Sequence, residues 1–284
     1  MTILNTTSDG LPHVYDLVYR TIHKEKQVSI VRLVERLCPE LEYKDLPLKN
    51  VLRTWKKLNV FKETEDEIWS LVDPSEGEPR KAAIKSLLDP IYNSDFWGTE
   101  FGSDYVRALC WMLLQDSDGM ILASKQLEQL EESQYEGTDE ILQNGTRING
   151  FKFWANYLGF ARPCLGDDQI QPGEAIRLYL PEIFFDNSRL DIETFLIRLN
   201  TVLPVFDGSL YRNEIRSKLK ARSGHEPQSG QFSVALSRGL LLLQGIGELN
   251  FLPPDADAIK REVLYRSDQS ALNVSHIEWK NFNE

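Results

Sequence analysis

Apolar residues recur every three or four positions near the amino terminus, which is the spacing of one face of a helix. This spacing predicts helices over residues 14–22, 30–37 and 48–58. The second helix is expected to end before Pro39, because the residue preceding a proline is pushed out of the helical region. Two short β-prone runs within residues 60–71 flank polar residues and predict a hairpin. Three helices and a hairpin predict a winged-helix unit, a variant of helix-turn-helix.

The predicted helix over residues 48–58 has one apolar and one basic face, and Asn59 suits the left-handed residue that ends a helix. In helix-turn-helix proteins the third helix enters the major groove, where lysine and arginine contact phosphates and base edges. The predicted wing is acidic, which opposes contact with a phosphate backbone. The basic face therefore predicts either a DNA-binding helix or the solvated face of a protein-docking unit. Its candidate DNA-binding residues are Lys49, Arg53, Lys56 and Lys57.

The same order of elements returns further along the chain. Helices are predicted over residues 105–114, 124–131 and 150–158, and the run at 175–180 fits either a strand or a short helix. At the end of the third of these helices, Trp154 and Gly159 match Trp55 and Asn59, pairing an inward aromatic residue with a left-handed helix end. Acids outnumber bases in this second group, which favours a solvated face or a protein surface over DNA contact.

A third group begins near residue 188, with helices predicted over residues 192–199, 209–219 and 232–244 and a candidate wing within residues 248–265. The sequence thus predicts a mainly α-helical fold with small β-hairpins, built from tandem winged-helix units. The predicted divisions are a winged-helix domain at 1–75, a linker with a connecting helix at 76–95, a second, acidic winged-helix-like domain at 96–187, a third at 188–270 and a C-terminal tail at 271–284.

A second basic cluster lies in the stretch YRNEIRSKLKAR, residues 211–222. Basic residues at the end of a helix offset the helix dipole, so helix capping explains some of them. The alternative is a surface for an anion or a nucleic acid. The candidate DNA-binding residues of this cluster are Arg212, Arg216, Lys218, Lys220 and Arg222, with Arg238 on the next predicted helix.

The net charge of −11 over 284 residues argues against sequence-blind coating of nucleic acid. Cys38, Cys110 and Cys164 lie far apart without a CxxC spacing, so neither a disulfide framework nor a zinc site is predicted. The amino terminus lacks the pattern of a signal peptide, and no window approaches the roughly 20 apolar residues of a membrane span. We expect a cytoplasmic protein that binds no cofactor, no metal and no membrane.

Catalytic motifs are missing from the sequence, which has no GxxxxGK[ST], HExxH or GxSxG. Each of the four histidines is isolated from any nucleophile and is expected to be structural or exposed. An acidic cluster of Asp167, Asp168 and Glu174 and the triplet at residues 278–280 are interpreted as loop and tail groups, with a metal-dependent nuclease as the alternative. We therefore expect no enzymatic activity.

Five stretches are spread over nearly the whole chain: SDGLPHVYDL at 8–17, residues 55–61, FKFWANYLGFA at 151–161, LPVFDGSLYR at 203–212 and FSVALSRGLLLL at 232–243. Together they resemble the DpdG family, a component of the bacterial Dpd gene cluster, which installs 7-deazaguanine derivatives in DNA and restricts unmodified DNA. The resemblance implies a phage-defence or restriction context and carries over no catalytic residue, since the shared motifs are structural. The expected function is a DNA-binding and partner-docking component of a defence complex, and the alternative is a pure adaptor for a helicase or nuclease subunit.

Overall fold

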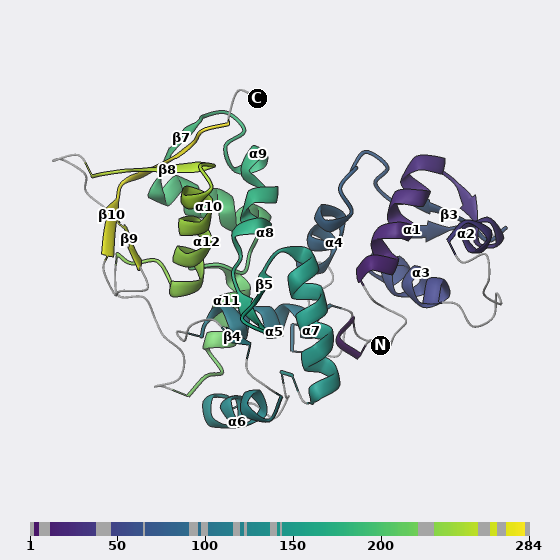
Figure 1. The fold of residues 1–284 in the computed structure, drawn as a ribbon, viewed down its shortest axis with the longest axis horizontal. Helices are drawn as coiled ribbons and strands as arrows, with labels where there is room; N and C mark the ends of the chain where they lie inside the picture. Colours follow the sequence, from purple (N-terminus) through teal and green to yellow (C-terminus); the bar gives the residue numbers. More distant parts are fainter. Residues whose placement is uncertain are drawn as a thin grey trace. The chain divides into compact units, whose positions relative to one another are not determined.

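The computed structural model confirms a mainly helical chain with small antiparallel sheets (Figure 1). Its contacts divide the chain into two compact units, Met1–Val106 with Ile141–Leu158, and Arg107–Glu140 with Gly159–Glu284. Within the described residues, no helix is both long and apolar enough to cross a membrane. The residues that the structure describes are 3–5, 12–37, 47–64, 66–90, 96–97, 102–115, 120–121, 124–136, 141–142, 144–220, 230–254, 262–265 and 271–281.

The first unit holds the elements η1 (Ile3–Asn5), α1 (Pro12–Glu25), β1 (Val28–Ser29), α2 (Ile30–Leu37), α3 (Pro47–Lys57), β2 (Phe61–Glu63), β3 (Ile68–Leu71), α4 (Pro79–Leu88) and α7 (Gly145–Leu158). Helix α5 (Ser103–Leu113) begins in the first unit and ends in the second. The predicted helices and hairpin of this part of the chain are therefore confirmed. Residues Ile141–Leu158 belong to the first unit, whereas the sequence prediction put them in the second domain.

The second unit holds β4 (Met120–Ile121), α6 (Ser124–Gln134), β5 (Ala161–Cys164), β6 (Asp167–Ile170), α8 (Gly173–Leu178), α9 (Leu180–Ile183), β7 (Arg189–Asp191), α10 (Ile192–Val202), α11 (Leu210–Arg216), α12 (Val234–Gly245), β8 (Leu249–Leu252), β9 (Glu262–Tyr265), β10 (Ala271–Val274) and β11 (His276–Trp279). The ambiguous run at 175–180 is helical. Residues 271–281, predicted as part of a tail, contain β10 and β11. Strand β8 pairs with β11, and β9 pairs with β10, so the wing predicted within residues 248–265 is wrong.

Three small antiparallel sheets share one strand order. The orders are β1-β3-β2, β4-β6-β5 and β7-β11-β8, so the last strand of each group lies in the middle. The pairs Val28↔Trp69, Met120↔Gln169 and Leu190↔Ile277 join the first strand of each group to this middle strand. A fourth, two-stranded sheet of β9 and β10 is inserted between β8 and β11. Each of the three three-stranded sheets therefore depends on segments that are distant in sequence.

Aromatic rings organise the core of the first unit. The Tyr15 ring centroid lies 4.3 Å from Trp55 and 5.9 Å from Trp154, and the two indoles are 5.1 Å apart. All three side chains are buried. The sequence pattern predicts that α1 buries Val14, Leu17, Val18, Thr21 and Ile22, which is partly wrong. Leu17 is 51% exposed, and Tyr15 and Tyr19 take inward positions. The two phenols can be buried because each hydroxyl donates to a backbone carbonyl.

The predicted left-handed helix ends are confirmed. Asn59 after α3 has φ 56°, and Gly159 after α7 has φ 83°. Gly247, which follows α12, is also left-handed, with φ 84°. After α3, the backbone amide of Val60 donates to the carbonyl of Trp55, and after α12 the amide of Glu248 donates to Leu243 in the same six-to-one pattern. These bonds satisfy carbonyls at the helix ends and direct the chain into the following strand.

Candidate nucleic-acid interface

Helix α3 presents the predicted basic face to solvent. Pro47 opens the helix, where a missing N–H costs nothing. Leu48, Val51, Leu52 and Trp55 are buried. Arg53, Lys56 and Lys57 are exposed, and Lys49 is partly exposed. The separation of the two faces follows from the helical spacing of the apolar residues, and it leaves the cations accessible.

The wing partly neutralises this basic face. The Lys56 ammonium lies 2.6 Å from the Glu63 carboxylate on β2 and 5.7 Å from the centroid of the Trp69 ring on β3. A shallow pocket of about 110 Å³ lies alongside, and its lining includes Lys49, Arg53, Glu63, Glu67 and Trp69. The helix and the wing therefore offer opposite charges to the same solvent region. A phosphate approaching α3 would meet the acids of the wing as well.

The second basic cluster does not form one exposed surface. Arg212 on α11 is 4% exposed, so the prediction that it contacts DNA is inconsistent with the structure. Its guanidinium donates to the backbone carbonyl of Leu113 at 3.2 Å and lies 3.4 Å from the Asp207 carboxylate. The apolar spacing of α11 turns this residue inward, and a buried arginine requires such partners. Its role in the described structure is to tie α11 to the end of α5 and to the preceding turn.

Two further cations of this cluster are bound to backbone carbonyls. The Lys220 ammonium donates to Glu132 at 2.8 Å, and the Arg238 guanidinium donates to Ile170 at 3.2 Å. Arg216 and Lys218 are exposed, and Arg222 lies outside the described residues. Of the candidate DNA-binding residues on this side, Arg216 and Lys218 thus have the most accessible side chains among those described.

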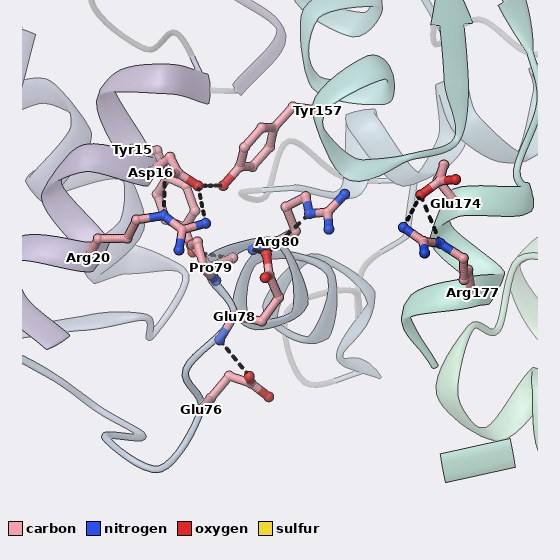
Figure 2. Close-up of polar contacts among 10 residues, drawn as sticks. All are labelled: Tyr15, Asp16, Arg20, Glu76, Glu78, Pro79, Arg80, Tyr157, Glu174 and Arg177. Atoms are coloured by element: carbon pink, nitrogen blue, oxygen red, sulfur yellow. Dashed lines mark hydrogen bonds and ion pairs between the residues drawn. The ribbon is translucent and has the colours of Figure 1, made fainter. Parts of the chain in front are cut away.

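The acidic cluster considered for a nuclease is dispersed. Asp167 and Asp168 lie on β6, and Glu174 lies on α8, where its carboxylate accepts a 3.0 Å bond from Arg177 (Figure 2). Glu278 of the C-terminal triplet accepts from the Asn250 side chain at 3.2 Å. In the part of the chain that is described, no three His, Cys, Asp or Glu residues are grouped so that they could hold a metal ion.

A polar cluster in the first unit was not found from the sequence. The Asp16 carboxylate on α1 accepts a 2.6 Å bond from Arg20 and a 2.9 Å bond from the Tyr157 hydroxyl on α7 (Figure 2). Burial, and then the charge of Asp16, raise the pKa of Tyr157, so the phenol remains a donor. Only the four-residue spacing of Asp16 and Arg20 could have indicated part of this cluster. The hydrogen bond between Tyr157 and Asp16 links α7 to α1, and these helices belong to the two sequence segments of the first unit.

Comparison with known proteins identifies the family of the chain. A family model described as DpdG-like matches residues 1–258. No curated protein and no solved structure matches. Because the family match covers most of the chain, the protein belongs to the DpdG-like family.

Proposed function

We propose that this DpdG-like protein is a non-enzymatic component of the Dpd restriction system that binds duplex DNA through α3 and docks protein partners. Family membership indicates a component of this system. The part of the proposal that concerns DNA rests on the geometry of the first unit. Its single most important support is the outward basic face of α3, with Arg53, Lys56 and Lys57 exposed above a buried apolar face.

The arrangement of the first unit supports a winged-helix interpretation. The chain order is α1-β1-α2-α3-β2-β3, and β3 pairs with both β1 and β2. In a helix-turn-helix protein, the helix before the wing is the one that enters the major groove. This helix is α3, and the hairpin β2–β3 is then the wing. The repeated strand order β4-β6-β5 and β7-β11-β8 extends the same interpretation to the rest of the chain.

Binding should be weak and strongly dependent on salt. Few cations face the DNA, the net charge is −11, and the wing adds carboxylates beside the helix. Affinity that comes from phosphate contacts falls with salt because bound counterions are released. We therefore expect binding at low ionic strength that is lost near physiological salt.

Fluorescence anisotropy with a labelled duplex, measured over a series of salt concentrations, tests the proposal. The triple variant Arg53→Ala, Lys56→Ala, Lys57→Ala should weaken binding and reduce the salt slope by about 1 for each lost phosphate contact. Lys125→Ala on α6 is the matched control, since it removes an exposed cation from the acidic region. Absence of binding by the wild type at low salt would refute DNA contact.

The second candidate function is an adaptor without DNA contact. The observation that favours it is the ion pair between Lys56 and Glu63, because it pairs a cation of α3 with a carboxylate of the same chain. An adaptor of this kind would pack against a helicase or nuclease subunit. It predicts co-purification with such a subunit that the triple alanine variant does not disturb, together with no binding of duplex DNA at any salt concentration.

A further inference from the structure

A pocket of about 140 Å³ lies in the first unit, away from the basic face of α3. Its apolar lining includes Leu58, Val60, Val72 and Ala82, from the end of α3, the wing and α4. The Tyr19 side chain adds an aromatic group to this lining. Pockets for cofactors and drug-sized ligands span about 300–1,000 Å³. The size therefore suits one long side chain better than a cofactor.

Carboxylates accompany this apolar lining. Asp73, Glu76 and Asp89 also line the pocket, against one ammonium, that of Lys85. Lys85 is 70% exposed and lies 3.5 Å from Asp73, a loose surface pair. The pocket therefore favours a cation.

The pKa values of two lining residues, Asp73 and Tyr19, are shifted. Hydrogen bonds from Ser75 hold the pKa of Asp73 below its ordinary value, so this carboxylate stays charged. Burial raises the pKa of Tyr19, and the charges of Glu76 and Asp73 raise it further. The Tyr19 hydroxyl donates to the carbonyl of Glu76 at 2.7 Å, which fixes the ring. The charge of Asp73 and the orientation of the Tyr19 ring are thus set before any ligand binds.

The chemistry of the pocket distinguishes between cations. Among the described residues, these carboxylates do not converge into a metal-binding group. Their spread suits a planar guanidinium, which offers five donors in fixed directions, is weakly hydrated and packs on aromatic faces. The methylene stem of the same side chain would cover Leu58 and Val60. A small hydrated ion would leave this apolar lining unused.

We propose that this pocket receives one arginine side chain from a segment of a protein partner. The inference deepens the docking part of the proposed function, and it gives the partner a basic residue in an exposed segment. It does not depend on DNA binding, because the pocket lining does not include Arg53, Lys56 or Lys57. Loss of arginine binding can therefore be measured separately from loss of DNA binding.

The test is a titration of the isotope-labelled full chain with the peptide Ac-Gly-Arg-Gly-NH₂, followed by NMR. Saturable shifts are expected at the amides of Asn59, Val60 and Ala82. The same peptide with citrulline, which keeps the shape and lacks the charge, should bind about tenfold more weakly, as loss of a charge-assisted hydrogen bond predicts. Equal binding of the two peptides, or no saturable shift, would overturn the proposal.

Charge variants locate the site. The double variant Asp73→Asn, Asp89→Asn should weaken arginine binding about tenfold. Glu35→Gln on α2 and Asp66→Asn at the wing turn, which remove exposed carboxylates outside the lining, should leave it unchanged. Lys85→Gln removes the competing ammonium and should strengthen binding, a gain that misfolding cannot produce. Unaltered or weaker binding by Lys85→Gln would contradict the proposal even if the double variant fails to fold.

Discussion

The Tyr157 phenol on α7 donates a 2.9 Å hydrogen bond to the Asp16 carboxylate on α1, across 141 positions of sequence. Arg20 binds the same carboxylate, so Asp16 keeps a partner when the phenol is removed. Tyr157→Phe should therefore lower the free energy of unfolding by about 1–2 kcal/mol. Urea denaturation followed by tryptophan fluorescence measures this change. An unaltered midpoint would show that the bond does not hold the two segments together.

Alkaline pH should destabilise the first unit. Burial is the main cause that raises the pKa values of Tyr15, Tyr19 and Tyr157 above the ordinary value of 10.0. Below pH 10 the phenols are protonated in both states, and above it the unfolded chain loses protons that the folded chain retains. This contribution to stability is therefore constant below about pH 10 and falls as the pH rises further.

Urea midpoints measured between about pH 8 and pH 11.5, with tyrosinate absorbance recorded on the same samples, test this expectation. Tyr157→Phe should make the fall shallower, because one of the phenols is removed. Tyrosinate absorbance of all tyrosines near pH 10 in a chain that is still folded would contradict it.

Two glycines with similar backbone angles should respond differently to alanine. Gly159 and Gly247 have φ of 83° and 84°, so both substitutions place a side chain in the left-handed region. A Cβ on Gly159 would lie 2.8 Å from the backbone nitrogen of Ala175, whereas one on Gly247 would meet nothing within 4 Å. We expect Gly247→Ala to cost about 1 kcal/mol and Gly159→Ala distinctly more. Thermal denaturation of the two variants isolates the effect of the contact with Ala175. Equal losses of stability would show that this contact adds no cost.

Two arginines of α11 differ in burial, so their alanine variants distinguish the effect of losing a buried ion pair from that of losing an exposed charge. Arg212→Ala would leave the largely buried Asp207 carboxylate without its guanidinium, which typically costs about 3–5 kcal/mol. Arg216→Ala removes an exposed charge and should change stability by less than about 0.5 kcal/mol. Chemical denaturation of both variants checks the difference. Similar stabilities would mean that Arg212 does not hold the core of the second unit.

The pairing of Lys56 with Glu63 should restrain DNA binding by the wild type. Glu63→Gln frees the ammonium and removes a carboxylate beside the approaching phosphates, so duplex affinity at low salt should rise about two- to fivefold. Glu35→Gln on α2 is the control, because it makes the same change at an exposed position outside the β2–β3 hairpin. Unchanged or reduced affinity after Glu63→Gln would show that the pairing of Lys56 with Glu63 does not restrain DNA binding.

The elements of the first unit could be predicted because their signals are local. Helical spacing placed Leu48, Val51, Leu52 and Trp55 inside α3, and the left-handed position of Asn59 follows from side-chain size and polarity. The inward turn of Tyr15 and Tyr19 could not be predicted, since it depends on carbonyls more than 50 residues away.

The candidate site could be predicted only in part, because some of its contacts join residues that are distant in sequence. The exposed cations of α3 follow from the helical pattern. The burial of Arg212 depends on Asp207 and on the carbonyl of Leu113, which no spacing rule brings together. Likewise, the pairing of Lys56 with Glu63 depends on how the hairpin folds back, and β11 was missed because an inserted hairpin separates it from β8.

The position of β11 in the middle of its sheet has a consequence during protein synthesis. Strands β7 and β8 do not pair with each other, and both bind β11, which is made about 25 residues after β8 ends. Until residues 276–279 have been made, the inner edges of β7 and β8 lack their partner, and unpaired edges favour association with other chains. Premature termination before residue 276 should therefore yield aggregation of the second unit.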